Sequence, residues 1–225
     1  MLKWTTGGAV QHPSTVQIRV QRSYPGRIRA GAPVPTRSMS PEEVIANIRH
    51  FTVGMRTPRT TPCTGLVLSG VGVATREDTP GAISLARTEK VERIILHAGI
   101  EDLESLDTSR FAPLVDLLVL PVQPGSLTVA ARTLEAARSA GVAVATSTVL
   151  HLNALDQLTS AARLLARAQP RHVTFTYPFP VSGNAAHEVP LPPRVMAALR
   201  PALDILDAAG MPATIKGLPA CHLGP

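Results

Sequence analysis

The sequence predicts an α/β fold built on a parallel β-sheet, and two observations lead to this prediction. Short runs rich in Val, Ile and Leu alternate with amphipathic segments of helical period along almost all of the 225 residues. The runs are nearly continuous in apolar residues, as in parallel strands that helices cover. Because 44% of the residues are hydrophobic and 17% charged, the chain has enough apolar material for one large domain and is not expected to be disordered.

The first unit is predicted from an alternating strand and from the clearest helix start in the chain. In residues 15–20, valine and isoleucine alternate with polar residues, as in a strand with one face in water. A loop rich in Gly, Pro and Arg follows. Ser40 can then cap a helix with Pro41 at its first position, and Glu43 completes a capping box.

The same strand-and-helix unit recurs five more times. Further strands are predicted at residues 65–69, 93–97, 117–122, 142–149 and 172–177. The helices that follow them are predicted at residues 78–90, 101–111, 127–141, 153–170 and 195–210, of which 101–111 has the weakest pattern. Residues 213–216 are a candidate for a short final strand. No linker divides these units, so one domain is expected.

The candidate site residues are those that follow the predicted strands. In parallel α/β folds, ligands bind at the carboxyl ends of the strands. Those ends carry Arg22, residues 69–75, His97, Gln123, Thr148, His151 and Tyr177. The two histidines have no carboxylate pair or second ligand at helical spacing, so hydrogen-bonded structural histidines are favoured over metal ligands or acid–base groups. Gly70 and Gly72 lack the third glycine of a dinucleotide-binding turn.

Several loop segments carry a more specific pattern. Residues 22–30 read Arg-Ser-Tyr-Pro-Gly-Arg-Ile-Arg-Ala, and residues 69–78 read Ser-Gly-Val-Gly-Val-Ala-Thr-Arg-Glu-Asp. Residues 97–99 read His-Ala-Gly, and residues 217–224 read Gly-Leu-Pro-Ala-Cys-His-Leu-Gly. Together with residues 173–185 and the six repeated units, these segments resemble the core of radical S-adenosylmethionine (radical SAM) enzymes. The resemblance implies a partial (β/α)6 TIM-like barrel of the radical SAM type over residues 15–217.

Measured against that family, the loop after the first strand is degenerate. Radical SAM enzymes carry C-x-x-x-C-x-x-C there, and the three thiolates hold a [4Fe-4S] cluster. Ser23, Arg27 and Ala30 occupy the cysteine positions in this chain. A hydroxyl is a poor iron ligand, a guanidinium is cationic without an acceptor, and a methyl group offers nothing. We therefore expect no [4Fe-4S] cluster and no other metal.

The resemblance also implies a vestigial ligand pocket. In the glycine motif after the second strand, the acidic residue that would hold the SAM ammonium group is replaced by Gly72. SAM is therefore expected to bind weakly or not at all. The residues assigned to this vestigial SAM or ligand pocket are Ser69, Gly70, Gly72, His97, Gln123, Thr148, His151 and Tyr177.

Charge and segment boundaries add three expectations. The whole formal charge of +6 resides in the first 37 residues, which precede the first acidic residue, Glu42. Residues 1–14 are assigned as an N-terminal basic extension and residues 218–225 as a truncated C-terminal tail.

No stretch approaches the ~20 apolar residues of a membrane span, and no signal-peptide pattern is present, so a cytoplasmic location is expected.

These observations predict a catalytically degenerate subunit. It would form a hetero-oligomer with a cluster-bearing radical SAM protein, or bind that protein's precursor-peptide or small-molecule substrate, in a biosynthetic or modification pathway. One alternative is a cluster-independent enzyme with His97, His151 or Tyr177 as proton carriers. Another is a nucleic-acid binder that uses the basic arm, although only 3% of the residues are aromatic and few bases could stack.

Overall fold

Seven strands form a single parallel sheet in the order in which they occur along the chain. A computed structural model describes residues 15–21, 38–54, 63–178 and 189–218. The strands are β1 (Thr15–Gln21), β2 (Gly65–Gly70), β3 (Arg93–His97), β4 (Leu117–Pro121), β5 (Val144–Val149), β6 (His172–Thr176) and β7 (Ala213–Lys216). Each strand pairs in parallel with the next one. The expected α/β class is therefore confirmed, and the candidate strand at 213–216 is a seventh strand of the sheet.

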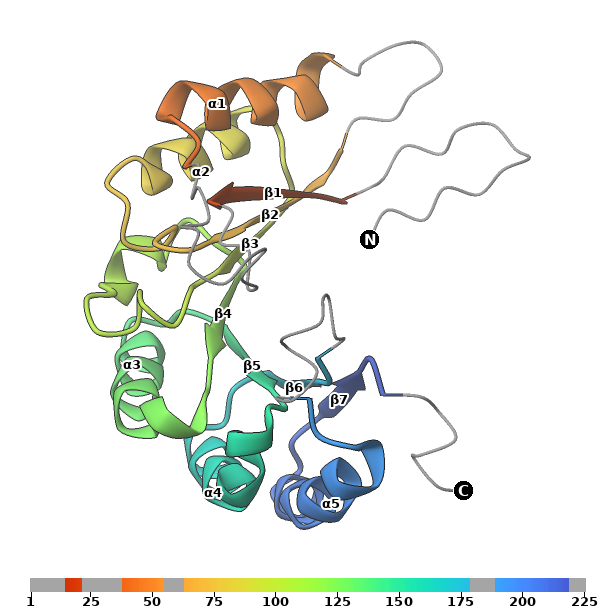
Figure 1. Cartoon of the computed structure of the whole chain (residues 1–225). Coiled ribbons are helices and arrows are strands. Elements are labelled where there is room, and N and C mark those ends of the chain that lie inside the picture. The colour runs from red at the N-terminus through yellow and green to blue at the C-terminus, as the bar shows by residue number, and fades with distance from the viewer. Residues whose placement is uncertain (1–14, 22–37, 55–62, 179–188, 219–225) are drawn as a thin grey trace.

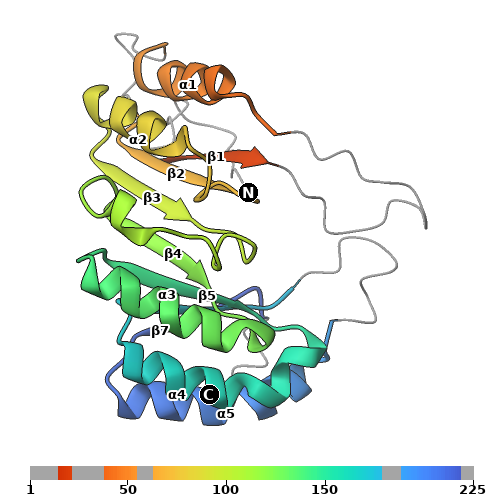
Figure 2. The ribbon, with the colours of Figure 1, turned by 90° about the vertical axis from the view of Figure 1, so that its left-hand side faces the viewer.

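The helices lie on one face of this sheet. They are α1 (Pro41–Arg49), α2 (Thr79–Thr88), α3 (Leu127–Ser139), α4 (Leu158–Ala168) and α5 (Pro192–Ala208). Figure 1 shows the sheet curved into an arc, with these helices on its outer, convex side. Figure 2 looks at the helix layer from that side. The arrangement is that of an open part of a β/α barrel, in which no described helix covers the inner, concave face.

Alternate strand residues form the core between the sheet and the helices. The register places Leu68, Leu96 and Leu118 side by side on β2, β3 and β4, and each of them is at most 1% exposed. Phe175 on β6 is also fully buried. Burying one side chain of this size contributes roughly 1.5–3 kcal/mol, so this set of residues holds the helices on the sheet.

Two helix starts lie where the sequence predicted them. Ser40 is the N-cap of α1: its Oγ accepts a hydrogen bond from the Glu43 amide at 3.2 Å, and its own amide donates to Glu43 Oε2 at 2.9 Å. The capping box is therefore complete. Helix α2 begins at Thr79, directly after Asp78, but the Asp78 carboxylate makes no capping hydrogen bond.

The helix expected at 101–111 is not an α-helix. This segment consists of turns followed by the 3-10 helix η2 (Thr108–Phe111). The Asp102 carboxylate accepts a hydrogen bond from the Gly99 amide at 2.6 Å, and the Asp107 carboxylate accepts one from the Ser109 amide at 3.1 Å. These local side-chain bonds compete with a regular helical ladder, which explains the difference.

The helix expected to begin at Asn153 begins later. Residues Leu152–Gln157 form the 3-10 helix η4, and α4 starts at Leu158. The end of α4 is as expected, because Gln169 takes a left-handed conformation with φ of 52° and Pro170 follows it.

Over the described ranges, no helix combines the length and the apolar character needed to cross a membrane.

Two buried threonines of β5 provide a test of this packing. Thr146 and Thr148 are fully buried, and neither hydroxyl has a hydrogen-bond partner among the described residues. An unsatisfied buried hydroxyl costs about 1–3 kcal/mol. Thr148→Val should therefore raise the free energy of unfolding by about 1 kcal/mol in urea denaturation followed by circular dichroism.

Thr133→Val is the matched control for this prediction. The Thr133 hydroxyl is buried too, but it lies 3.2 Å from the Leu103 carbonyl oxygen and 3.0 Å from that of Val129. Its replacement should lower the free energy of unfolding by about 1 kcal/mol. Equal destabilisation by both substitutions would show that the Thr148 hydroxyl is satisfied in the folded protein.

Candidate functional site

The concave face of the sheet carries a row of polar side chains on β1, β2 and β3. The register pairs Arg19 with Ser69, and Ser69 with His97. Paired residues of neighbouring parallel strands project from the same face, so these three side chains lie in one row. Gln17 lies on the same face of β1 and donates from Nε2 to Ser69 Oγ at 2.9 Å. Ser69 is thus held in place within the row.

A second polar group lies on the same face of β5, β6 and β7. Thr176 and Lys216 are the last residues of β6 and β7, and they are register partners. Thr174 pairs both with Thr214 of β7 and with Ser147 of β5. Lys216 is exposed, and the four hydroxyl residues are half-buried.

The register connects these two groups to one face. His97 pairs with Val119, and Val119 pairs with Ala145. Ser147 follows Ala145 by two residues, so its side chain lies on the same side of the sheet as that of His97. This face is opposite the one that carries Leu96 and Leu118. The helix-covered core and the polar row therefore occupy opposite faces.

The charge of Lys216 contributes to the electrostatics of His97 across the concave side of the sheet. Burial lowers the pKa of His97 below its ordinary value, and the positive charge of Lys216 lowers it further. In a flat sheet, β3 and β7 would be four strand spacings apart, about 19 Å. Curvature of the sheet shortens this separation across the concave side (Figure 1). His97 is consequently held towards its neutral form.

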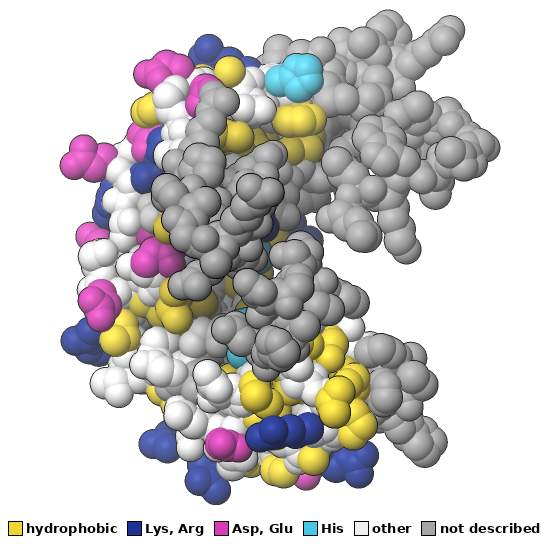
Figure 3. All heavy atoms as spheres, viewed as in Figure 1, with side chains coloured by type: hydrophobic (Ala, Val, Ile, Leu, Met, Phe, Trp, Pro, Cys, Tyr) yellow, Lys and Arg dark blue, Asp and Glu magenta, His cyan; other side chains and the backbone are white. Residues whose placement is uncertain are grey.

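The concave face carries no acidic side chain on the described strands. None of the seven strands contains Asp or Glu at all. In Figure 3, the acidic side chains lie mainly along the outer, helix-bearing rim of the molecule. The fixed charges on the concave face of the described strands are therefore positive.

A buried carboxylate ties together the loops that follow β2 and β3. Asp102 is fully buried, and its Oδ1 accepts a hydrogen bond from Thr75 Oγ1 at 2.8 Å. Its Oδ2 accepts from the Gly99 amide at 2.6 Å. Both carboxylate oxygens are thus engaged within the rim of the sheet, and Asp102 positions the two loops next to Ser69 and His97.

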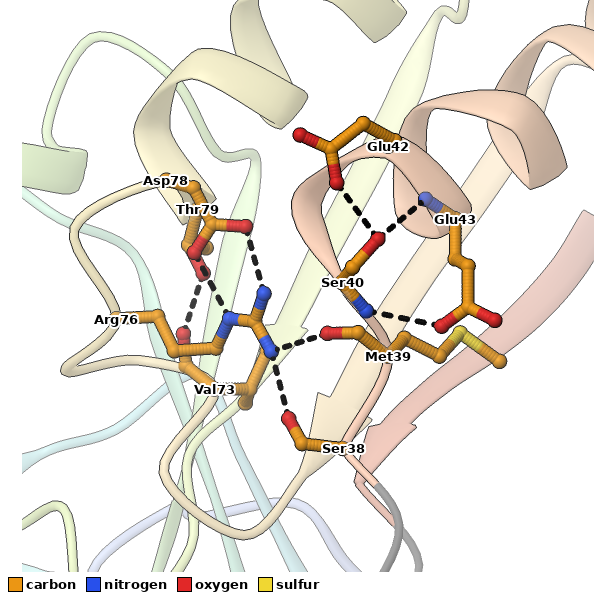
Figure 4. Close-up of polar contacts among 9 residues, drawn as sticks. All are labelled: Ser38, Met39, Ser40, Glu42, Glu43, Val73, Arg76, Asp78 and Thr79. Carbon is orange, nitrogen blue, oxygen red and sulfur yellow. Dashed lines mark hydrogen bonds and ion pairs between the residues drawn. The ribbon is translucent and has the colours of Figure 1, made fainter.

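An ion pair ties the loop after β2 to the start of α1 (Figure 4). Arg76 donates from Nε and from one terminal nitrogen to the two carboxylate oxygens of Asp78, at 2.8 and 2.7 Å. Its other terminal nitrogen donates to Ser38 Oγ at 2.9 Å and to the Met39 carbonyl at 2.8 Å. The Arg76 hydrogen bond is the main cause that lowers the pKa of Asp78. The Arg-x-Asp sequence therefore has a structural role here.

Only part of the predicted pocket shares the concave face. Ser69 and His97 lie in the polar row. Gly70 and Gly72 follow Ser69 and have positive φ values of 135° and 71°, which glycine adopts without strain. Thr148, by contrast, pairs with buried Phe175 and lies on the helix-covered face.

The other predicted residues occupy loops or lie outside the described part of the chain. Gln123 and His151 are the N-cap residues of the 3-10 helices η3 (Pro124–Ser126) and η4, and His151 is exposed. Tyr177 directly follows β6, and its hydroxyl donates to the Pro190 carbonyl at 2.9 Å. The cluster-loop residues Ser23, Arg27 and Ala30 lie outside the described residues, as do the terminal segments 1–14 and 219–225.

The sequence interpretation did not select Lys216. Its signal was its place at the end of a candidate strand, but that strand was not counted among the six units from which site residues were taken.

Hollows of the molecular surface are also found on the outer side. One lies between α3 and α4 and is lined by Ala131, Glu135, Arg138, Leu164, Arg167 and Ala168. It contains none of the predicted site residues.

Comparisons with known proteins give only remote similarities. No family model and no curated protein matches the chain. One similar solved structure is the N-terminal domain of a proposed aldolase from Bacteroides vulgatus, with 12% identity and a TM-score of 0.44 over 77% of this chain and 64% of that one. Another is a GH18 chitinase from Pseudoalteromonas aurantia, with 12% identity and a TM-score of 0.32 over 77% of this chain and 88% of that one. This chain thus spans less than two thirds of the aldolase domain.

The Arg76–Asp78 pair generates a pH-dependent prediction. Asp78→Asn should lower the free energy of unfolding by about 1–3 kcal/mol at pH 7, because a bidentate bond to a charged group is lost. The pKa of Asp78 is lower in the folded protein than its ordinary 3.8. The pair therefore stabilises the fold above that pH, and its contribution disappears as the pH falls through the folded-state pKa.

Urea denaturation at several pH values measures this effect. The difference between the variant and the unmodified protein should shrink once the pH is below 3.8. Glu135→Gln is the control, because its ion pair with Arg138 is about 60% exposed and should change stability by less than about 0.5 kcal/mol. A pH-independent difference for Asp78→Asn would contradict the assigned role of the ion pair.

Proposed function

We propose that this protein is a radical-SAM-like subunit that carries no cluster of its own. It binds a cluster-bearing radical SAM partner enzyme, that enzyme's peptide or small-molecule substrate, or both, in a biosynthetic or modification pathway. The observation that carries the proposal lies in the loop after β2. Arg76 and Asp78, which the family resemblance retains, hold the scaffold together, whereas Gly72 stands where the SAM-binding carboxylate would be.

The architecture is compatible with such a docking role. In the described sheet, β1 and β7 are the outermost strands and do not pair with each other. Edge strands present unpaired backbone groups, and another chain can add a strand to them. An intact partner would supply the cluster chemistry that the loop at Ser23, Arg27 and Ala30 lacks.

The described geometry gives less support to the alternatives. The cluster-independent enzyme would use His97, His151 or Tyr177 as proton carriers at the barrel mouth. Burial and Lys216 lower the pKa of His97 in the concave row, His151 is exposed in a loop, and the Tyr177 hydroxyl donates to the Pro190 carbonyl. The nucleic-acid alternative depends on a basic arm most of which lies outside the described residues.

Iron reconstitution tests the proposed origin of the cluster loop. Under anaerobic conditions with iron and sulfide, the unmodified protein should retain no iron, because none of the three positions supplies a thiolate. The triple variant Ser23→Cys, Arg27→Cys, Ala30→Cys should bind about four irons per chain and absorb near ~400 nm.

A control with the cysteines at unrelated places separates specific assembly from thiol content. The variant Ser84→Cys, Ser109→Cys, Ser139→Cys introduces the same number of thiols in α2, η2 and α3, and it should bind no stable cluster. Equal iron uptake by both triple variants would contradict the assigned family resemblance. A cluster in the unmodified protein would contradict it as well.

Purification of the tagged full chain from its source cells tests the partner. A second protein with a C-x-x-x-C-x-x-C motif should co-elute in near-equal amount and carry the visible absorption of its cluster. Because the chain has a net charge of +6, the complex should be washed at about 0.5 M salt, which screens adventitious ionic contacts. Elution of the chain alone under these conditions would contradict the proposed complex.

A further inference from the structure

We propose that the concave face binds an oxyanion, a carboxylate or phosphate group of a small ligand, between Lys216 of β7 and His97 of β3. This site lies at the carboxyl ends of the strands, where each of the two residues is the last of its strand. The inference does not depend on the proposed function, since an enzyme and a binding subunit could both use such a site.

The charge balance of this face favours an anion. Within the described part of the chain, Lys216 has no ion-pair partner, and the strands supply no carboxylate. Two carboxylates of the neighbouring loops are already engaged: Asp102 by Thr75 and Gly99, and Asp78 by Arg76. No described carboxylate therefore offsets the Lys216 charge, which lowers the pKa of His97, and a bound anion would offset that charge.

The polar groups around Lys216 are suited to a ligand with several acceptor oxygens. Its ammonium group has three donors, and the Thr176 hydroxyl lies beside it in the register. Thr174, Thr214 and Ser147 add three more hydroxyls on the same face, and none of the four forms a hydrogen bond to a described residue. Half-buried donors next to a cation form the strong, charge-assisted hydrogen bonds that carboxylates and phosphates accept.

The distribution of charge favours a small ligand over a nucleic acid. Arg93 also lies on the concave face, but it is the first residue of β3 and thus belongs to the opposite end of the strand. Arg19 lies on the far side of Ser69, on β1. A polyanion needs a continuous path of cations along its phosphates, whereas the described face concentrates donors near one lysine.

Titration of the isotope-labelled full chain by NMR tests the site. The probes are inorganic phosphate and, separately, citrate, each against sodium chloride at equal ionic strength. At least one probe should shift the His97 imidazole and Lys216 side-chain resonances in a saturable way. A response to phosphate alone or to citrate alone supports the site and identifies the class of group, and a response to both supports a general oxyanion site.

Lysine variants give the decisive comparison. Lys216→Met should weaken binding of the probe by about tenfold or more and should raise the pKa of His97, because the repulsion is removed. Lys90→Met changes the net charge equally, but Lys90 follows α2 on the outer side and is exposed, so binding should stay unchanged.

Three results would overturn the site: no saturable shift with either probe, shifts centred on other residues, or equal weakening by both lysine variants. Circular dichroism checks that the variants fold. If Lys216→Met fails to fold, the resonance mapping in the unmodified protein decides the question by itself, with Lys216→Gln as the second variant.

Discussion

The strict alternation of side chains along seven parallel strands is the constraint on which the rest of this structure depends. One row of each strand faces the helices and is mainly apolar, as Leu68, Leu96 and Leu118 show, with the buried threonines of β5 as exceptions. The other row is free to be polar, because no described helix covers it. The hydrophobic core and the candidate site therefore lie on opposite faces of the same sheet. A one-residue change of strand register would exchange the side chains of the two faces.

The curvature of the sheet determines how the strand ends lie across the concave side, which the alternation of side chains does not determine. The sheet bends around its concave side, which shortens the separation between the ends of β3 and β7, and the Lys216 charge contributes to the lowered pKa of His97. The loops at this edge are held by buried or half-buried charges: Asp102 joins the loops after β2 and β3, and Arg76 joins the loop after β2 to the start of α1. These bonds connect the loops at the edge of the polar face to one another.

Much of the fold could be predicted from local sequence, and the errors have specific causes. The capping box at Ser40 and the strand at 93–97 depend on neighbouring residues alone, so pattern was sufficient. The expected helix at 101–111 was wrong because Asp102 bonds to Thr75, 27 residues away in the chain, and to the Gly99 amide. Thr148 was assigned to a pocket from its place near a strand end, but its position within the alternation puts it in the core.

The sequence by itself determined the alternation of strands and helices, the capping box at Ser40, and the three non-cysteine residues of the cluster-like loop. These are properties of single residues and short periods. Only the tertiary structure decided that β7 completes the sheet and that Lys216 shares the concave face with His97. Two residues 119 positions apart are placed on one curved face by the register, twist and curvature of several strands, which no local pattern encodes.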